Sequence, residues 1–311
     1  MDIETICTQT SLLEEKIKRS IQRIVQAHNI AAQVGNSLIL AYSGGKDSDI
    51  LLDLAIKSGV PFEVQHNHTT VDAPETVYHI RAVFKHLNSQ GITTKVNFPP
   101  EIVLADGKVT RATMWNLIPK KLFPPTRIVR YCCEYFKERR FDGQHIMTGI
   151  RWAESAKRKN GRGVHEKLHK QKERRVIYMD ENDDAHKLFE ICHKKVRAAT
   201  NPIIDFTDQE VWTYIQQNNI VVNPLYALGF SRVGCIGCPM NTRALREFER
   251  YPKYKAAYLR AFEQMRLARE RRGRANDRNL QSAETIFRWW TEPKFDVNQT
   301  SLLDQVPTQE A

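Results

Sequence analysis

A phosphate-binding loop is predicted where glycines, hydroxyls and a cation follow one another in the hexapeptide Ser-Gly-Gly-Lys-Asp-Ser. Glycines let an anion approach the backbone, and N–H groups at the start of a helix favour negative charge. We expect the amides of Gly44 and Gly45 to surround phosphate oxygens. The hydroxyls of Ser43 and Ser48 would add donors, and Lys46 would add positive charge.

The carboxylate of Asp47 is the unexpected member of this loop, because it would repel a phosphate. We therefore expect it to bind a metal ion or to hold the amides of the loop itself. An ordinary Gly-Gly turn capped by serine and aspartate is the alternative, and the spacing is not that of a Walker A loop.

Four of the six cysteines form two close pairs, Cys132 with Cys133 and Cys235 with Cys238. Four thiolates make a complete tetrahedral ligand set, and six cysteines are too few for a disulfide scaffold in a chain of this length. Structural zinc and an iron-sulfur cluster both remain open, although adjacent cysteines are unusual in zinc fingers. Burial as small apolar side chains is the alternative. Glycines at 234 and 237 are expected to allow the turn between the second pair.

The elements that must position these residues follow a βαβ pattern. Apolar runs predict strands at 37–42, 62–65, 93–98 and 145–149, and helical spacing predicts helices at 4–28, 48–57, 74–87 and 207–218. The hexapeptide thus lies between a strand and a helix. We expect an α/β fold with a doubly wound, mostly parallel sheet, followed by a helical C-terminal part that carries cysteines of the cluster.

Composition favours a sizeable core and a polyanionic partner. The 311 residues are 41% hydrophobic and 27% charged, with a formal net charge of +11 and a mean hydropathy of -0.51. Residues 151–175 contain ten Lys or Arg against three Asp or Glu, which predicts a basic loop. No apolar run approaches the ~20 residues of a membrane span, and the N-terminus lacks the pattern of a secretory leader. We expect a cytoplasmic protein without a membrane span.

The loop resembles the SGGxDS loop of the PP-loop ATP pyrophosphatase superfamily, which has the adenine nucleotide alpha hydrolase-like fold. The cysteine pairs resemble the [4Fe-4S] signature of the adenylyl-sulfate reductase (PAPS/APS reductase) group, shared by the DndC-like ATP pyrophosphatases of DNA phosphorothioation. Further segments are similar to that group between residues 35 and 245; they are 72–76, 149–158, 201–205, Trp212 and 223–226.

The resemblance implies additional site residues. Asp72 and Glu75 correspond to a second substrate loop, and Gly149, Arg151, Glu154, Ser155 and Arg158 correspond to the GxRxxES segment. Asp72 and Glu75 also suit a turn and a helix start, since Pro74 favours a first helical position. Both arginines are alternatively solvated charges, but their place after a strand end favours phosphate contact. Lys46, Asp47 and Arg151 are the predicted catalytic residues.

Three functions follow from the resemblance. The first is an ATP pyrophosphatase that binds ATP, Mg²⁺ and a [4Fe-4S] cluster and adenylylates a substrate for sulfur transfer to nucleic acid, with a sulfur donor such as a cysteine desulfurase. The second is a thiol-dependent reductase of an adenylylated nucleotide, adenylyl sulfate or its 3'-phosphate. Reductases of this group carry a nucleophilic cysteine in a C-terminal ECGxH motif, whereas residues 291–311 contain none, and Cys192 would have to substitute. The third is a non-catalytic regulatory protein.

The predicted organisation has three parts: an N-terminal helical segment at 1–34, a nucleotide-binding domain with the cysteine cluster at 35–245, and a basic helical extension at 246–311. Trp152, Trp289 and Trp290 are either stacking platforms for bases or core residues. A solvated face is the alternative for both basic segments. A homo-oligomer is compatible with these features.

Overall fold

The computed structural model describes residues 3–138, 144–168, 176–178, 197–241, 244–274 and 279–291 of the chain. Two compact units emerge from the contacts within the chain. Unit 1 comprises residues 1–67, 74–97 and 139–233, and unit 2 comprises residues 68–73, 98–138 and 234–311. The units interleave along the chain, and the three-part organisation at 1–34, 35–245 and 246–311 stays a prediction.

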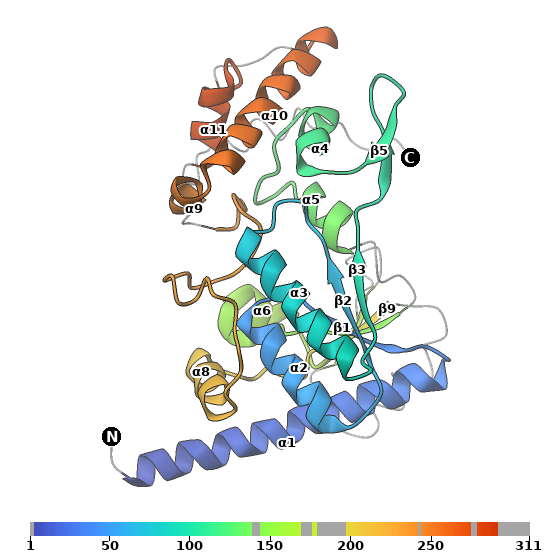
Figure 1. Ribbon diagram of the computed structural model, residues 1–311, viewed down its shortest axis with the longest axis vertical. Coiled ribbons are helices and arrows are strands. Elements are labelled where there is room, and N and C mark those ends of the chain that lie inside the picture. The colour runs from blue at the N-terminus through green and yellow to red at the C-terminus, as the bar shows by residue number, and fades with distance from the viewer. Residues whose placement is uncertain are drawn as a thin grey trace. The chain divides into compact units, whose positions relative to one another are not determined.

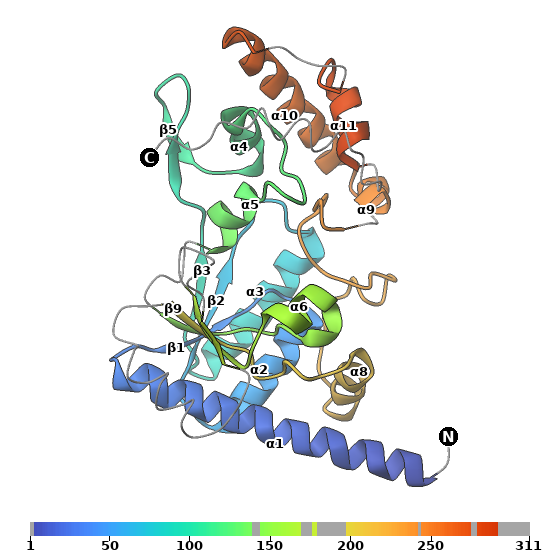
Figure 2. The same cartoon turned by 180° about the vertical axis from the view of Figure 1, so that it is seen from behind.

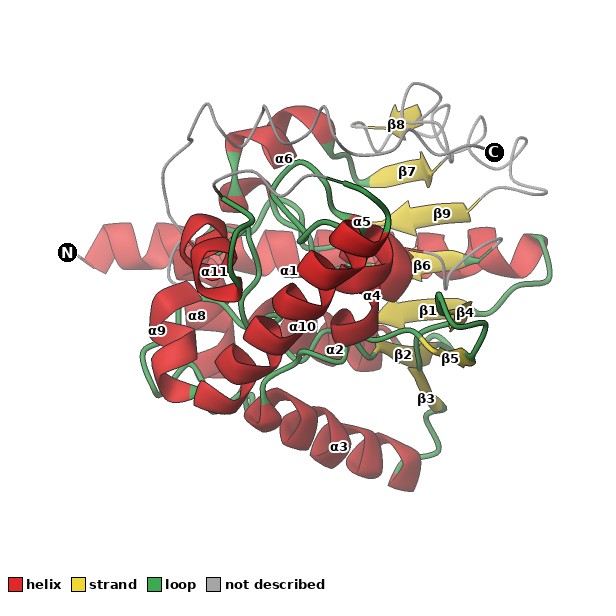
Figure 3. Cartoon of the chain, turned by 90° about the horizontal axis from the view of Figure 1, so that it is seen from above, coloured by secondary structure: helices red, strands yellow, loops and turns green. Residues whose placement is uncertain are grey.

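Unit 1 is built on a seven-stranded sheet with the order β3-β2-β1-β6-β9-β7-β8, and Figure 3 shows these strands side by side. The strands are β1 (Leu38–Ala41), β2 (Glu63–Asn67), β3 (Thr94–Asn97), β6 (His145–Met147), β7 (His165–Leu168), β8 (Val176–Tyr178) and β9 (Arg197–Thr200). The first five in spatial order are parallel, and β7 is antiparallel to both β9 and β8. The expected mostly parallel sheet is confirmed.

The helices of unit 1 are α1 (Ile3–Gln33), α2 (Lys46–Ser58), α3 (Pro74–Ser89), α6 (Ala156–Gly161) and α8 (Asp208–Gln217), with a 3-10 turn at Trp152–Glu154. Figure 1 shows α1, α2 and α3 in blue and cyan. The main core lies on one side of the sheet, because Leu38 and Leu40 of β1 join buried side chains of α1, α2, α3 and α8. Ile39 points to the other face and packs in a smaller cluster with Ile146 and Ala199.

Unit 2 combines a hairpin with helices packed around aromatic side chains. Its elements are β4 (Glu101–Val103), β5 (Val109–Arg111), α4 (Met114–Lys121), α5 (Tyr131–Cys133), a π-helix at Glu134–Glu138, α9 (Ala244–Arg250), α10 (Pro252–Arg271) and α11 (Ala283–Thr291). Figure 2 shows α10 beside α11. The rings of Tyr258 and Trp290 are 4.7 Å apart, and Trp290 Nε1 donates to Pro125 O at 2.6 Å. Trp289 and Trp290 are therefore core residues and not stacking platforms.

No helix among the described residues is both long and apolar enough to cross a bilayer. Some sequence-based expectations concern residues outside the described ranges. They are Cys192, the basic residues at 169–175, Arg278 of the basic extension, and the tail after residue 291.

We predict a pH-dependent contribution to stability from the contact between α1 and α8. Lys16 Nζ donates to both carboxylate oxygens of Glu210 at 2.8 Å. Burial opposes ionisation of Glu210, but the hydrogen bonds from Lys16 and Thr207 outweigh it and lower the pKa of the carboxyl. Because the pKa of Glu210 is lower in the folded state, its ion pair contributes fully to the free energy of unfolding above the ordinary carboxyl pKa. This contribution is lost as the pH falls through the pKa of the folded state.

Glu210→Gln should therefore lower the melting temperature at neutral pH by about 2–4 °C, corresponding to about 1 kcal/mol. The difference from wild type should shrink near about pH 3, where the unfolded carboxyl is also protonated. Glu15→Gln, an exposed change on α1, is the matched control in thermal unfolding at both pH values. An equal loss at both pH values would contradict the prediction.

Candidate nucleotide and cysteine sites

The candidate nucleotide site lies where the strand order reverses. Strand β1 pairs with β2 on one side and with β6 on the other, and the chain runs on from β1 into the Ser-Gly-Gly loop. In open parallel sheets such a switch point opens a crevice at the carboxyl ends of the strands. The segment after β6, beginning at Thr148, reaches the same edge. Residues 43–48 and 149–158 are thus brought together, as the sequence predicts.

Hydroxyl oxygens organise the loop from within. Ser48 Oγ accepts the N–H of Gly45 at 3.1 Å and the N–H of Ser43 at 3.4 Å, and it donates to Gly45 O at 2.7 Å. Tyr226 OH accepts the N–H of Lys46 at 3.0 Å. These hydroxyls occupy acceptor positions that the sequence analysis assigned to phosphate oxygens. The loop therefore presents its amides to oxygen acceptors.

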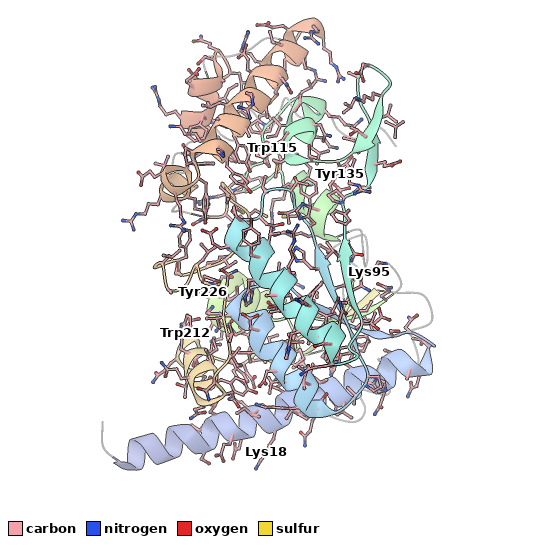
Figure 4. All side chains as sticks on the ribbon, in the orientation of Figure 1. Lys18, Lys95, Trp115, Tyr135, Trp212 and Tyr226 are labelled. Atoms are coloured by element: carbon pink, nitrogen blue, oxygen red, sulfur yellow. The ribbon has the colours of Figure 1, made fainter. Side chains whose placement is uncertain are left out.

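Two distant side chains fix the outer surface of the loop. Asn223 is fully buried, and its Nδ2 donates to Gly44 O at 3.0 Å and to Thr76 Oγ1 at 3.1 Å. Gly44 has a φ of +72°, and a Cβ there would lie 2.9 Å from Ile80 Cγ1. Only glycine suits this position. Tyr226, whose ring packs edge-on to Trp212 at 5.4 Å, completes the support (Figure 4).

The guanidinium of Arg151 holds Asp47. Arg151 Nε donates to Asp47 Oδ1 at 2.7 Å, Nη2 donates to Asp208 Oδ1 at 2.7 Å, and Nη1 donates to Phe206 O at 3.1 Å. The side chain is 1% exposed. Burial opposes its charge, but the two carboxylates outweigh that effect and raise its pKa. Gly149 permits this approach, since a Cβ there would lie 3.0 Å from the backbone of Asp47.

Asp47 pairs with two cations. Its Oδ2 accepts Lys46 Nζ at 3.1 Å while Oδ1 accepts Arg151 Nε at 2.7 Å. Each carboxylate oxygen keeps a further lone pair, so the metal-binding role expected for Asp47 stays a prediction.

The remaining residues of the GxRxxES segment shape the chain beside the loop. Glu154 Oε1 accepts the backbone N–H of Arg151 at 3.1 Å and pairs with Arg158 Nη1. Ser155 is the N-cap of α6, and its Oγ accepts the N–H of Arg158 at 3.3 Å. Glu154 and Ser155 thus fold this segment and position Arg158.

Asp72 and Glu75 belong to different units. In unit 2, the carboxylate of Asp72 accepts the N–H of Thr69 at 2.9 Å and its hydroxyl at 2.7 Å, which closes a turn. In unit 1, Glu75 lies in the first turn of α3. Asp72 therefore lies in a turn and Glu75 at a helix start, as the alternative interpretation expected. A role of either residue in substrate binding stays a prediction.

A buried polar cluster behind the loop was missed by the sequence analysis. Tyr42 OH donates to Asp49 Oδ1, and His79 Nε2 lies 3.2 Å from the same oxygen. All three side chains are buried, and burial together with Asp49 raises the pKa of Tyr42. The three residues come from the end of β1, from α2 and from α3, so no local sequence pattern signals their contact.

The second candidate site is in unit 2, where the four paired cysteines converge. The thiol of Cys132 interacts electrostatically with those of Cys133, Cys235 and Cys238. A hydrogen bond between the adjacent thiols raises the pKa of Cys132 and lowers that of Cys133. Arg130 Nη2 also donates to Cys133 Sγ at 3.0 Å, which favours the thiolate. All four are free thiols, as a ligand set requires.

The turn between the second cysteine pair is held rigidly. Gly237 has a φ of +69°, and a Cβ there would lie 2.4 Å from Phe248 Cζ. Its N–H donates to Glu247 Oε2 at 2.9 Å, and Tyr258 OH donates to Ile236 O at 3.0 Å. Gly234, by contrast, has no atom within 4 Å of a Cβ position. Only the second of the two predicted turn glycines is sterically required.

The mostly parallel sheet with flanking helices and a glycine loop at its switch point define an α/β protein with a PP-loop-like fold. Residues 37–241 match the family described as phosphoadenosine phosphosulfate reductase domain. The chain belongs to this family.

The individual proteins to which the chain is similar share low sequence identity with it. The adenosine 5'-phosphosulfate reductase of Geobacillus kaustophilus is 24% identical over 66% of this chain and 74% of its own length. Uncharacterized protein MJ0973 of Methanocaldococcus jannaschii is 26% identical over 78% of this chain, which spans 51% of that protein. Among solved structures, phosphoadenylyl-sulfate reductase from Candida auris has a TM-score of 0.45 at 16% identity, covering 76% of this chain and 96% of its own.

We predict that Gly237→Ala destabilises unit 2 because the added Cβ overlaps Phe248 and the residue keeps a positive φ. Overpacking of this kind costs about 1–3 kcal/mol. Gly234→Ala is the matched control and should leave the melting temperature unchanged. Thermal unfolding of the metal-free proteins checks this; equal melting temperatures for the two variants would contradict it.

Proposed function

We propose that this protein is a PP-loop ATP pyrophosphatase that adenylylates an acceptor for sulfur transfer, with nucleic acid as the acceptor and a [4Fe-4S] cluster held by the four cysteines. The observation that carries this proposal is the loop itself. Its amides at Ser43, Gly45 and Lys46 donate to hydroxyl acceptors at a switch point of a parallel sheet. Phosphate oxygens accept stronger hydrogen bonds than hydroxyls do, so a nucleotide would replace these acceptors.

The residues of the loop would do the binding and orienting. The amides of Gly45 and Lys46, with the hydroxyls of Ser43 and Ser48, would hold the two terminal phosphates of ATP. The acceptor oxygen would then form a bond to the α-phosphorus while the bond to the bridging oxygen breaks and pyrophosphate leaves with that electron pair. Two equivalents of a thiol would reduce the persulfide of a sulfur donor such as a cysteine desulfurase, becoming a disulfide and releasing hydrosulfide. The hydrosulfide would form a bond to the phosphorus of the acceptor and displace AMP, which carries away the acceptor oxygen.

The cysteine set suits a group larger than one metal ion. Zinc holds thiolates at about 2.3 Å, which places tetrahedral sulfurs roughly 3.8 Å apart. Among the described residues, no three cysteine sulfurs lie within 4.8 Å of one another. Cys132, Cys133, Cys235 and Cys238 would hold the cluster, which when bound supplies structural cross-linking and redox or sulfur chemistry.

Reduction of an adenylylated sulfate is the second candidate function, and the matched family and the Geobacillus relative favour it. That reaction requires a nucleophilic thiol beyond the four paired cysteines, and the sequence offers Cys7 and Cys192. Sulfite released from adenylyl sulfate in the presence of a thiol donor would support the reductase. Pyrophosphate and AMP released from ATP would support the ATP pyrophosphatase.

Ser48→Ala should lower kcat/KM for pyrophosphate release from ATP by about tenfold or more, because the hydroxyl that orders the loop amides is lost. Ser58→Ala is the matched control, since Ser58 Oγ lies at the other end of the same helix, where it donates to Ala55 O and accepts the N–H of Val60. Pyrophosphate release is measured with Mg²⁺, nucleic acid and a sulfide source. No release by wild type under these conditions would exclude the ATP pyrophosphatase.

Cys235→Ser should abolish the brown chromophore of anaerobically purified protein and lower its melting temperature, because bound metal stabilises the native state. Cys7→Ser, outside the paired cysteines, should retain both. Iron and sulfide analysis with absorption spectra checks the outcome. Full iron retention in Cys235→Ser would refute the ligand assignment.

A further inference from the structure

Three arginines gather beside the nucleotide loop in unit 1. Arg158 lies on α6, Arg162 follows directly after α6, and Arg232 lies on the segment that precedes the second cysteine pair. Burial lowers the pKa of Arg158, and the positive charges of Arg232 and Arg162 lower it further. Arg162 and Arg232 therefore both lie within electrostatic range of Arg158, and we call these three guanidinium groups the arginine set.

Buried contacts hold the α6 side of the arginine set in place. Trp152 Nε1 donates to Arg162 O at 2.8 Å. Glu166 is fully buried and accepts Arg162 Nη1 at 2.8 Å, the N–H of Gly163 at 3.1 Å and Asn201 Nδ2 at 3.1 Å. A buried carboxylate is costly unless it is fully hydrogen-bonded. The chain from Trp152 to Glu166 is thus a fixed support.

The other side of the arginine set adjoins the nucleotide loop directly. Val233 Cβ lies 3.9 Å from the position that a Cβ on Gly45 would take, and Tyr226 OH lies 3.3 Å from the same position. Arg232, the neighbour of Val233, is exposed and forms no ion pair with any described residue. It therefore presents an uncompensated charge next to the loop.

The charges of the set do not balance. Arg158 pairs with Glu154, and Arg162 pairs with Glu166. Arg232 adds a third positive charge that these two carboxylates do not neutralise. An anion between the guanidiniums would relieve their mutual repulsion, and the planar fork of arginine matches two phosphate oxygens.

We propose that the arginine set binds a phosphodiester of the nucleic-acid acceptor and so places the acceptor next to the nucleotide loop. This inference rests on the proposed function, and it extends that function by locating the acceptor. The amides of the loop take the phosphates of ATP, which leaves the arginine set for a second anionic group. A phosphodiester backbone is such an anionic group, and the net charge of +11 would attract it from solution.

The test measures binding of labelled duplex DNA, and of duplex RNA of the same sequence, to the full chain at several salt concentrations. Arg232→Gln should weaken binding and reduce the slope of log K against log salt by about 0.9 on DNA, the value for one lost phosphate contact. Weaker binding of Arg232→Gln to either DNA or RNA supports the site. The nucleic acid whose binding is weakened is the one that supplies the phosphodiester. Arg81→Gln, an exposed change on α3, should leave the slope unchanged.

Three results would overturn the arginine site. Equal slopes for Arg232→Gln and Arg81→Gln would show that attraction is spread over the surface. Weaker ATP binding by Arg232→Gln with unchanged nucleic-acid binding would assign the set to the nucleotide. If the wild-type protein binds no nucleic acid, the arginine set has no phosphodiester ligand.

Pyrophosphate release by the same preparation is measured separately, so the two proposals fail independently. Intact release without nucleic-acid binding overturns the arginine site and nucleic acid as the acceptor, and it leaves the ATP chemistry standing. Intact nucleic-acid binding without release overturns the ATP chemistry.

Discussion

The ion pair between Arg151 and Asp47 is the contact on which the nucleotide site depends. A guanidinium that is 1% exposed is unstable unless its donors are satisfied, and here each nitrogen has an oxygen partner, one on α2 and two at the start of α8. Removing one partner of such a buried pair typically costs about 3–5 kcal/mol, because the other charge is left uncompensated. The first turn of α2, the end of β6 and the start of α8 are therefore held in one arrangement.

That arrangement determines what the loop can present. Arg151 and Lys46 engage both oxygens of Asp47, so the carboxylate is neutralised and does not repel an incoming phosphate. Asn223 meanwhile ties Gly44 to α3 from the opposite side. The loop is thus fixed from both sides before any ligand binds, and preorganised donors of this kind lower the free-energy cost of binding an anion.

Local order in the sequence explains which features could be predicted. The strand, loop and helix around Ser43–Ser48 are consecutive, so hydrophobic periodicity and glycine chemistry locate them. Strand β9 and the hairpin of unit 2 are short and escaped that analysis. The partnership of Asn223 with Gly44 spans 179 residues, and sequence spacing carries no distance information at that range.

The cysteine site shows how much of a ligand set depends on residues that never touch the ligand. The spacing of the cysteines is visible in the sequence, but their convergence requires Gly237 to approach Phe248 and Glu247 to accept the N–H of Gly237. Converging thiolates repel one another, and Arg130 offsets that repulsion by donating to Cys133 Sγ. Hydrogen bonds and positive charge near the sulfurs also set the reduction potential of a bound cluster. The packing of unit 2 therefore governs both whether the four sulfurs meet and which charges and hydrogen bonds surround them.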